Sequence, residues 1–483
     1  MFVPREERLL DCCVEAPPAF LPKARYALRM LLLPLGLAPR WVERGALAGP
    51  GLYYGPEEEA LPAGCVSLSL RPETAAYFAG RSPYPADRVR WMEWGGTRWP
   101  VLFDDAEEGD LVASAFFWLA GWQEHTVPER DRHGRFPYAA SLQAAFGTPL
   151  RPAVDAYRER LAERLQAAGV DLHRRTWGGA NWALCPTHDV DYLRKWRRGL
   201  VYREAVPHLL LGTRGDAPAA RLRRFGAFLR QWARRGDVYR EALVRLHRET
   251  RQRGGTATFF FKTGAHGPFD VPYPLDDPFL HARVAALRAD GFEVGLHPSY
   301  HAHTHAFYLA DEAARLAELA GARPVSVRQH YLRYTPPTTP RLHARHGFRI
   351  DTSLGFAEHE GFRHATCHPF QLYDVQADAP LDVWEMPLAV MESALFNRRG
   401  FDPDGAVAQT KAVMETVRRF RGVAVLLWHN ILWDELDHPD WGRHFEATLD
   451  HAVAGGARIA SLRAALAEWL AAPAEVKAGA AVR

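Results

Sequence analysis

The sequence predicts an α/β protein in which a (β/α) barrel follows a smaller domain of mixed α and β structure. From about residue 178 onward, short apolar β-type runs alternate with amphipathic stretches of helical period. Several of these runs, such as Ala-Thr-Phe-Phe-Phe at 257–261, are apolar throughout, which is typical of parallel strands covered by helices on both faces. Glycines stand between the helical stretches and the next strands, where helix C-caps are expected.

We place a mixed α+β domain at residues 1–177, the barrel at 178–472 and an alanine-rich tail at 473–483. The segment Gly178-Gly179-Ala180-Asn181 marks the boundary between the two domains. After the first strand, residues 192–235 form a long, arginine-rich and helix-prone insertion, with an expected break in its Gly- and Pro-containing middle.

Seven or eight β/α units fit in the roughly 290 residues of the barrel region, which favours a barrel over an open sheet. We expect strands at 182–187, 256–261, 292–296, 325–328, 348–351, 382–387, 423–428 and 458–461. We expect helices at 238–253, 279–290, 307–319, 406–419 and 462–470. In the N-terminal domain, strands are expected at 66–70 and 99–103, and helices at 111–121 and 153–168.

Composition excludes several classes of protein. With 47% hydrophobic and 24% charged residues, the chain is globular, and its net charge of +3 gives no broad cationic surface for nucleic acid. The local basic runs at 194–198 and 221–224 are typical of solvated helix faces. The five cysteines lack Cys-x-x-Cys spacing and are expected to be reduced thiols. We see neither a signal peptide nor a transmembrane segment, so we expect a cytoplasmic protein; its oligomeric state is left open.

Polar residues follow the apolar runs of the barrel. Burying unpaired carboxylates in a strand is costly, and acids placed where parallel strands end are typical of active sites in α/β enzymes. The strand ends carry Thr187-His188-Asp189-Val190-Asp191, His297-Pro298-Ser299-Tyr300-His301, Arg328-Gln329-His330, Asp351, Glu385 and His429-Asn430. Because these ends share one face of a barrel, the acids, imidazoles and arginine are expected to converge.

An aspartate beside paired histidines is the ligand chemistry of a divalent first-row metal such as zinc. His297 and His301, four residues apart, aim their rings at one point if the segment turns helically. The alternative is a histidine-rich solvent loop, since His303 and His305 follow. Asp351 is more simply explained as a turn cap than as a catalytic group. Four nearby tryptophans offer stacking faces for sugars, although such rings are more often core packing: Trp182, Trp384, Trp428 and Trp433.

These motifs resemble the polysaccharide deacetylase (NodB-homology) family. The resemblance rests on the order Thr-x-Asp, Ala-Thr-Phe-Phe, His-x-x-x-His, an arginine motif and a late Leu-x-x-His, over roughly residues 180–470. It implies a distorted (β/α)7-type barrel and a metal-dependent carbohydrate esterase. Residues 1–177 are similar to the poorly characterised region that precedes this domain in one branch of the family.

Carried over residue by residue, the resemblance implies that Asp189 is the general base and that Arg328 pairs with it. His429 would be the general acid. The metal ligands would be Asp191, His297 and His301, and no other cofactor is implied.

The chain departs from the family pattern at two motifs. Its acids are Asp-Val-Asp where the family usually has an adjacent pair, so the assignment of Asp189 and Asp191 could be exchanged. Its arginine motif is Arg-Gln-His-Tyr, which leaves Arg333 as a competitor for Arg328 and makes His330 a possible additional site group.

The sequence thus predicts a metal-dependent hydrolase, with zinc as the expected ion, that removes an acetyl group from an N- or O-acetylated carbohydrate. The expected partner is a carbohydrate or a glycan precursor, and no nucleic acid is expected. Two alternatives remain: a hydrolase of the same fold that cleaves a non-sugar C–N bond, and an inactive carbohydrate-binding or scaffold protein.

Overall fold

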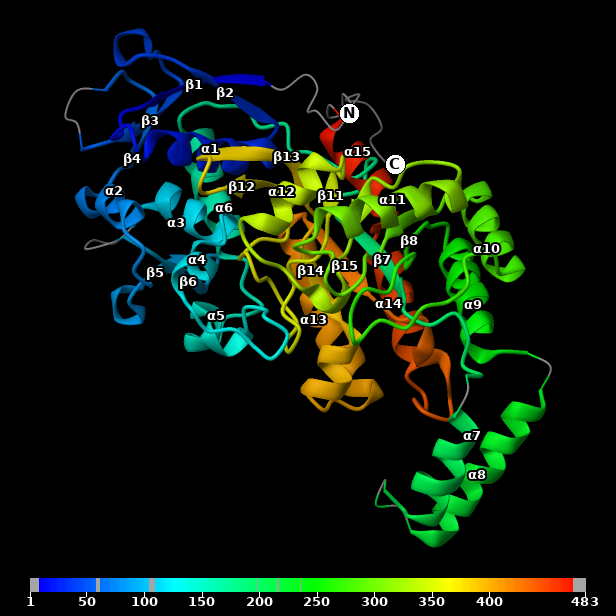
Figure 1. Ribbon diagram of the computed structural model, residues 1–483. Coiled ribbons are helices and arrows are strands. Elements are labelled where there is room, and N and C mark those ends of the chain that lie inside the picture. Colours follow the sequence, from blue (N-terminus) through cyan, green and yellow to red (C-terminus); the bar gives the residue numbers. More distant parts are fainter. Residues whose placement is uncertain are drawn as a thin grey trace, which may run out of the picture.

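The acid-bearing strand β7 (Ala183–Val190) lies near the middle of a ten-stranded sheet. The computed structural model in Figure 1 describes residues 8–57, 61–103, 109–197, 199–213, 215, 217–234 and 236–471, so the predicted tail lies outside the described residues. The strand order is β14-β15-β7-β8-β9-β10-β11-β13-β12, and β16 pairs with the beginning of β7. All these pairings are parallel except that of β12 with β13. This curled, largely parallel sheet confirms the predicted fold class, and β14 and β12 form its two edges.

The eight strands expected in the barrel region are all present, although several are shorter or shifted. They are β7, β8 (Thr258–Phe261), β9 (Glu293–Leu296), β10 (Ser326–Val327), β11 (Ile350–Asp351), β13 (Ala379–Glu385), β15 (Val423–Leu427) and β16 (Arg458–Ile459). The five expected helices are α9 (Val238–Gln252), α10 (Pro278–Ala289), α11 (Ala306–Ala320), α13 (Pro403–Phe420) and α15 (Leu462–Leu470). The sequence analysis missed β12 (Phe370–Asp374), β14 (Leu388–Met391), α12 (Thr338–Arg345) and α14 (Gly442–Ala454).

The N-terminal part contains a second sheet of four parallel strands, in the order β2-β1-β3-β4. Its strands are β1 (Arg8–Val14), β2 (Leu37–Trp41), β3 (Gly51–Gly55) and β4 (Cys65–Ser69), followed by a hairpin of β5 (Arg90–Trp94) and β6 (Thr97–Val101). Its helices are α1 (Leu21–Leu32), α2 (Pro72–Ala79), α3 (Leu111–Leu119), α4 (Trp122–Thr126), α5 (Leu142–Ala145) and α6 (Ala153–Ala167). The sequence analysis did not foresee this parallel sheet.

Buried charges attach α6 to the barrel. Asp155 accepts hydrogen bonds from the backbone N–H of Cys367, at 2.7 Å, and from the Thr366 hydroxyl, at 3.0 Å. The same carboxylate pairs with Arg158 and with His368. Burial by itself would raise the pKa of Asp155, but the charges of Arg158 and His368 outweigh burial and hold this pKa below its usual range. A buried network of charges therefore joins the two parts of the chain.

The same group has metal-ligand composition, since Asp155, Cys367 and His368 bring one candidate atom each within 4.8 Å. However, Arg158 Nη1 lies 2.9 Å from His368 Nδ1, so a guanidinium already occupies this position. Burial also raises the pKa of the Cys367 thiol, which keeps it protonated, whereas a metal needs the thiolate. We therefore interpret this group as structural.

Replacing Asp155 by asparagine should lower the free energy of unfolding by about 3–5 kcal/mol at neutral pH, because Arg158 would stay buried without its counter-charge. The folded pKa of Asp155 lies below its unfolded value, so its contribution is present above the unfolded pKa and is lost as the pH falls through the folded one. Denaturant unfolding at several pH values should therefore show that the difference between variant and parent shrinks in acid.

The matched control is Asp382→Asn, which removes an exposed carboxylate paired with Arg349 at 2.6 Å. It should cost less than about 1 kcal/mol, as exposed ion pairs usually do. An Asp155 variant as stable as the control would contradict the interpretation.

The insertion after β7 is a helical hairpin that projects from the rest of the molecule (Figure 1). Helix α7 (Leu200–Arg203) continues into a π-helical segment at Glu204–Leu210, and α8 (Pro218–Ala233) runs back. The predicted break at 212–218 falls at the tip of the hairpin. None of the described helices is both long and apolar enough to cross a lipid bilayer.

Candidate metal and acid–base site

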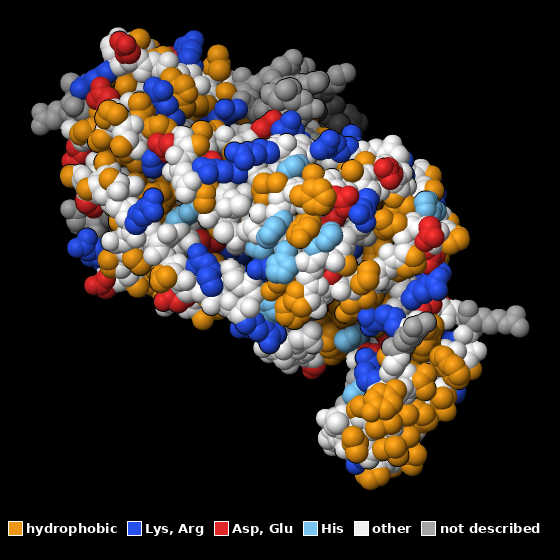
Figure 2. Space-filling view, in the orientation of Figure 1, with side chains coloured by type: hydrophobic (Ala, Val, Ile, Leu, Met, Phe, Trp, Pro, Cys, Tyr) orange, Lys and Arg blue, Asp and Glu red, His pale blue; other side chains and the backbone are white. Residues whose placement is uncertain are grey.

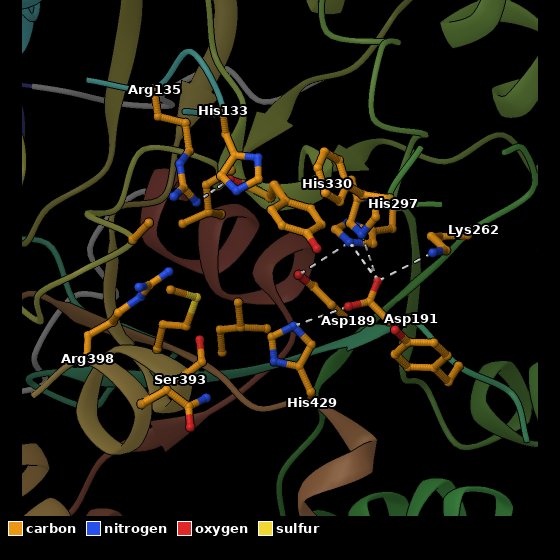
Figure 3. A pocket seen from close by; sticks show the side chains of 18 of the residues that line it. His133, Arg135, Asp189, Asp191, Lys262, His297, His330, Ser393, Arg398 and His429 are labelled. Carbon is orange, nitrogen blue, oxygen red and sulfur yellow. Dashed lines mark hydrogen bonds and ion pairs between the residues drawn. The ribbon is translucent and has the colours of Figure 1, made fainter. Parts of the chain in front are cut away.

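The polar residues that follow the strands line one pocket of about 290 Å³ (Figure 3). Asp189 and Asp191 come from the end of β7, and Lys262 follows β8. His297 follows β9, and His429 comes two residues after β15. The predicted convergence is therefore observed for these two aspartates and for three histidines, since His330 after β10 also lines the pocket. It is not observed for the other two acids: Asp351 pairs with His343 and accepts from the Ser353 hydroxyl, and Glu385 accepts from the Leu354 N–H.

The spacing of the two acids follows from the geometry of β7. Side chains alternate between the two faces of a strand, so Asp189 and Asp191 both point into the pocket while the residues between and before them point away. His188, on the other face, is fully buried against Phe259 and donates from Nδ1 to the backbone carbonyl of Trp428. Burial lowers the pKa of His188 to about 3, so its ring is neutral and structural. Asp-Val-Asp thus presents two carboxylates to one cavity.

Asp191 lies at the centre of a group of metal-ligand composition. Its Oδ1 atom is 3.4 Å from Nε2 of His297 and 3.3 Å from Nε2 of His330. One candidate ligand atom from each of the three side chains lies within 4.8 Å of the others. Burial would raise the pKa of Asp191, but His330 and His297 outweigh burial and hold this pKa well below its usual value. The carboxylate is therefore ionised.

The hydrogen bonds around these rings fit a cation. His297 donates from Nδ1 to the carbonyl of Arg328, and His330 donates from Nδ1 to Asp270, both at 2.7 Å. With Nδ1 donating in both rings, each Nε2 faces Asp191, as in metal-ligating histidines. Burial would lower the pKa of His330, but the Asp191 carboxylate outweighs burial and raises this pKa, so a bound cation would displace a proton from this ring. Asp191 Oδ1 is itself buried and has no hydrogen-bond partner within the described chain. Two imidazole nitrogens and a carboxylate oxygen facing one point fit the donor set of a divalent metal.

Lys262 is the additional charge in this group. Its ammonium lies 3.7 Å from Asp191 Oδ1, and its side chain is almost fully buried. A cation held by the three ligands would share Asp191 with this lysine.

The structure does not bring His301 into the group. The segment after β9 forms turns, and helix begins only at Ala306, so His297 and His301 do not share a helical face. His301 instead accepts a hydrogen bond at Nδ1 from Arg333, at 3.4 Å. The group of metal-ligand composition therefore contains His330 beside Asp191 and His297, and not the His301 expected from the family resemblance.

Asp189 lies beside the group and pairs with the arginine named by the sequence motif. Its Oδ1 is 3.4 Å from Arg328 Nη1, and its Oδ2 is 3.7 Å from His297 Nε2. Arg328 is fully buried and is fixed by further hydrogen bonds to Thr187 and Thr352. Arg333, the competitor, donates instead to the carbonyls of His133 and Tyr300.

His429 stands on the other side of Asp191. Its Nε2 is 3.7 Å from Asp191 Oδ2, and its Nδ1 pairs with Glu392, which follows β14. Burial alone would lower the pKa of His429, but the Glu392 carboxylate outweighs burial and raises this pKa to about 10. His429 is therefore protonated at neutral pH and has a proton to give.

The N-terminal part supplies one wall of the pocket. Arg132 is exposed at the pocket, and the buried ring of His133 is held by the Tyr300 hydroxyl, 3.1 Å from its Nδ1. The partly exposed rings of Phe269 and Tyr331 lie 5.3 Å apart beside His133 and present apolar faces to the cavity. All four tryptophans considered above are buried, so they are core packing.

Sequence reasoning missed Lys262, Asp270, Glu392 and His133 as site residues. Lys262 and Glu392 each follow an apolar strand directly, which is the same signal that identified the other site residues. Asp270 and His133 lie in loops, and nothing in the local pattern marks them.

Comparison with known proteins gives distant matches. Residues 67–169 match a family of unknown function (DUF7033). No curated protein matches the chain. Among solved structures, the chain is similar to a protein of Mycobacterium smegmatis described as a polysaccharide deacetylase, with 17% identity and a TM-score of 0.39 over 60% of this chain and 91% of that one.

Two further solved structures are similar. Puue allantoinase is 14% identical, with a TM-score of 0.39 over 61% of this chain and 92% of its own. A CE4 family pseudoenzyme from Bacillus anthracis is 10% identical, with a TM-score of 0.29 over 60% of this chain and 67% of its own. These likenesses are remote, so the fold assignment rests on strand order and the functional argument on the geometry of the pocket.

Proposed function

We propose that the protein is a metal-dependent hydrolase that removes an acetyl group from an acetylated carbohydrate. One observation carries the proposal: an acid paired with arginine, a protonated histidine and an Asp-His-His group surround one pocket. Hydrolysis of an amide or ester needs a base for the attacking water and an acid for the leaving group, and these two roles require groups in opposite protonation states.

Asp191, His297 and His330 would hold a divalent metal, with zinc as the first candidate. When bound, the ion would acidify a water molecule and polarise the acetyl carbonyl. Asp189 would accept the proton of the attacking water, while Arg328 keeps its carboxylate oriented toward the pocket. His429 would then donate its proton to the departing amine or alcohol, since Glu392 keeps the ring charged.

The pocket wall supports a carbohydrate substrate. Phe269 and Tyr331 are 44% and 37% exposed, and ring faces of this kind stack on the apolar faces of sugars. Arg132 and Arg398 are exposed at the same pocket and offer guanidinium donors to sugar hydroxyl or anionic substituents.

The proposal is tested by acetate release from a panel of N- and O-acetylated sugars and oligosaccharides, after loading with zinc. We expect acetate release that a chelator abolishes and added metal restores, with Asp191→Asn as the inactive control. Cleavage of a cyclic amide such as allantoin without acetate release would replace the proposal by the C–N hydrolase alternative. Sugar binding without turnover under every metal tried would replace it by the inactive binding protein.

A further inference from the structure

The helical hairpin, defined as residues 199–234, exposes an unusual share of the molecule's large apolar side chains. Thirteen large hydrophobic residues are exposed within the described chain, and seven of them lie on this hairpin. They are Val201, Tyr202, Leu210, Leu211, Leu222, Leu229 and Trp232. Figure 2 shows them as an apolar surface on the projecting lobe, away from the compact body. Such a gathering marks a surface that contacts a partner.

Helix α8 arranges part of this apolar surface as a stripe. Leu222, Phe225, Leu229 and Trp232 follow one another at spacings of three, four and three residues, which places them on one face of the helix. Leu222 is 64% exposed and Trp232 is 54% exposed, so the stripe faces outward.

Arginines lie beside this stripe. Arg223, Arg230 and Arg234 are exposed, and no ion pair of theirs is recorded within the described chain. The hairpin's one described carboxylate, Glu204, is only 2% exposed as a side chain and pairs with Arg224 and Arg203. The exposed surface that the described residues of the hairpin form is therefore apolar and cationic.

Other basic residues are paired with acids of the barrel region, at what we call the root of the hairpin, where it meets residues 434–437. Lys195 pairs with Asp434, and Arg224 pairs with Asp437. Gln231 bridges the two sides, since it accepts from Lys195 and donates to Asp434, both at 2.8 Å. Ion pairs and hydrogen bonds thus fix the root to the barrel. The exposed Arg223, Arg230 and Arg234 take no part in this network.

We propose that this hairpin binds the surface of an anionic lipid bilayer. A helical hairpin that exposes leucine, tyrosine and tryptophan beside arginines, and no acid among its described residues, matches the interface of anionic membranes in both its apolar and its charged components. Exposed aliphatic side chains such as Leu211 and Leu222 have no counterpart in nucleic-acid binding, where cations and stacked rings dominate.

The hairpin lies near the pocket along the chain, so membrane binding would also place the pocket near the bilayer. Asp191 and Tyr192, which line the pocket, precede the start of the hairpin at residue 199 by fewer than ten residues. The root network rests on residues 434–437, which closely follow His429. Docking of the hairpin would hold the pocket close to the bilayer, where a lipid-linked glycan precursor is found. The membrane contact itself does not depend on the proposed hydrolysis.

The test is cosedimentation of the full-length protein with phosphatidylcholine vesicles, with and without phosphatidylglycerol. We expect binding at least about tenfold stronger to the anionic vesicles, weakened by salt, because each basic residue near such a surface contributes about fivefold. The triple variant Leu222→Ser, Leu229→Ser and Trp232→Ser should lose binding. The double variant Arg223→Glu and Arg230→Glu should lower affinity at least about tenfold.

The matched control is Phe307→Ser, which removes an apolar side chain that is 76% exposed on α11, outside the hairpin. It should bind like the parent, and circular dichroism should show that every variant is folded. The proposal would be overturned if the parent protein bound neither kind of vesicle. It would also be overturned if both hairpin variants bound the anionic vesicles as strongly as the parent does. A concentration-dependent dimer that the triple variant abolishes, without vesicle binding, would instead assign this face to a second copy of the chain.

Discussion

Replacing His330 by glutamine should lower the affinity for a divalent metal by at least about 100-fold and remove the hydrolytic activity with it. Loss even of an outer group that orients a metal ligand typically costs 10–100-fold, so loss of a ligand should cost no less. The substitution should keep the fold, since His330 lies in a short 3-10 helix (His330–Leu332) that lines the pocket and is not part of the sheet. Zinc titration followed by calorimetry measures the affinity directly.

His301→Gln is the matched control, because it makes the same substitution in a segment that also follows a strand of the barrel sheet. It should leave metal affinity within about threefold of the parent, since His301 contacts Arg333 rather than Asp191. The opposite result, with metal lost from the His301 variant and retained by the His330 variant, would restore the ligand set implied by family resemblance.

Asp189→Asn should reduce kcat by about 10²–10⁴-fold while the protein keeps its metal, because an amide cannot accept the proton of the attacking water. The substitution preserves shape, and Asp189 lies outside the Asp191, His297 and His330 group. Single-turnover acetate release and metal content, measured on the same preparation, separate the two effects.

A buried, arginine-paired carboxylate away from the pocket provides the control. Asp374 pairs with Arg341, and its variant Asp374→Asn should keep the parental kcat. If the Asp189 variant retained parental turnover, or lost metal and activity together, the assignment of Asp189 as base and Asp191 as ligand would be contradicted.

The fold was predictable where the apolar pattern is strong. Long runs such as 257–261 and 423–428 became β8 and β15, because strands buried on both faces need apolar side chains at every position. Edge elements were not predictable in the same way. β14 follows β13 with only Met386 and Pro387 between them, so the pattern merges the two strands. The inner strand β1 was missed for another reason, because it carries Asp11 and exposed residues among its apolar ones.

The site was predictable to the extent that its residues follow strands. Asp189, Asp191, His297, Arg328 and His429 all do so, and all lie close to the positions that strand order implies. The third member of the group around Asp191 could not be chosen from spacing, because His301 and His330 were both available and only the path of the loop after β9 separates them. His133 and Asp270 reach the pocket through tertiary packing, which no local pattern records.

The position of β7 has a consequence for the way this protein is made. β7 pairs with β8, the next strand of the sheet along the chain, and also with β15, which is synthesised much later. A growing chain can complete the N-terminal parallel sheet while the ribosome is still far from residue 423, because domains form as units from the N-terminus. Until β15 emerges, β7 has one open edge of unpaired backbone N–H and C=O groups, which is a target for chaperones and for misassembly. Asp189 and His429 therefore meet only after residue 429 has been synthesised, so a chain terminated before that residue would have the proposed base without the proposed acid.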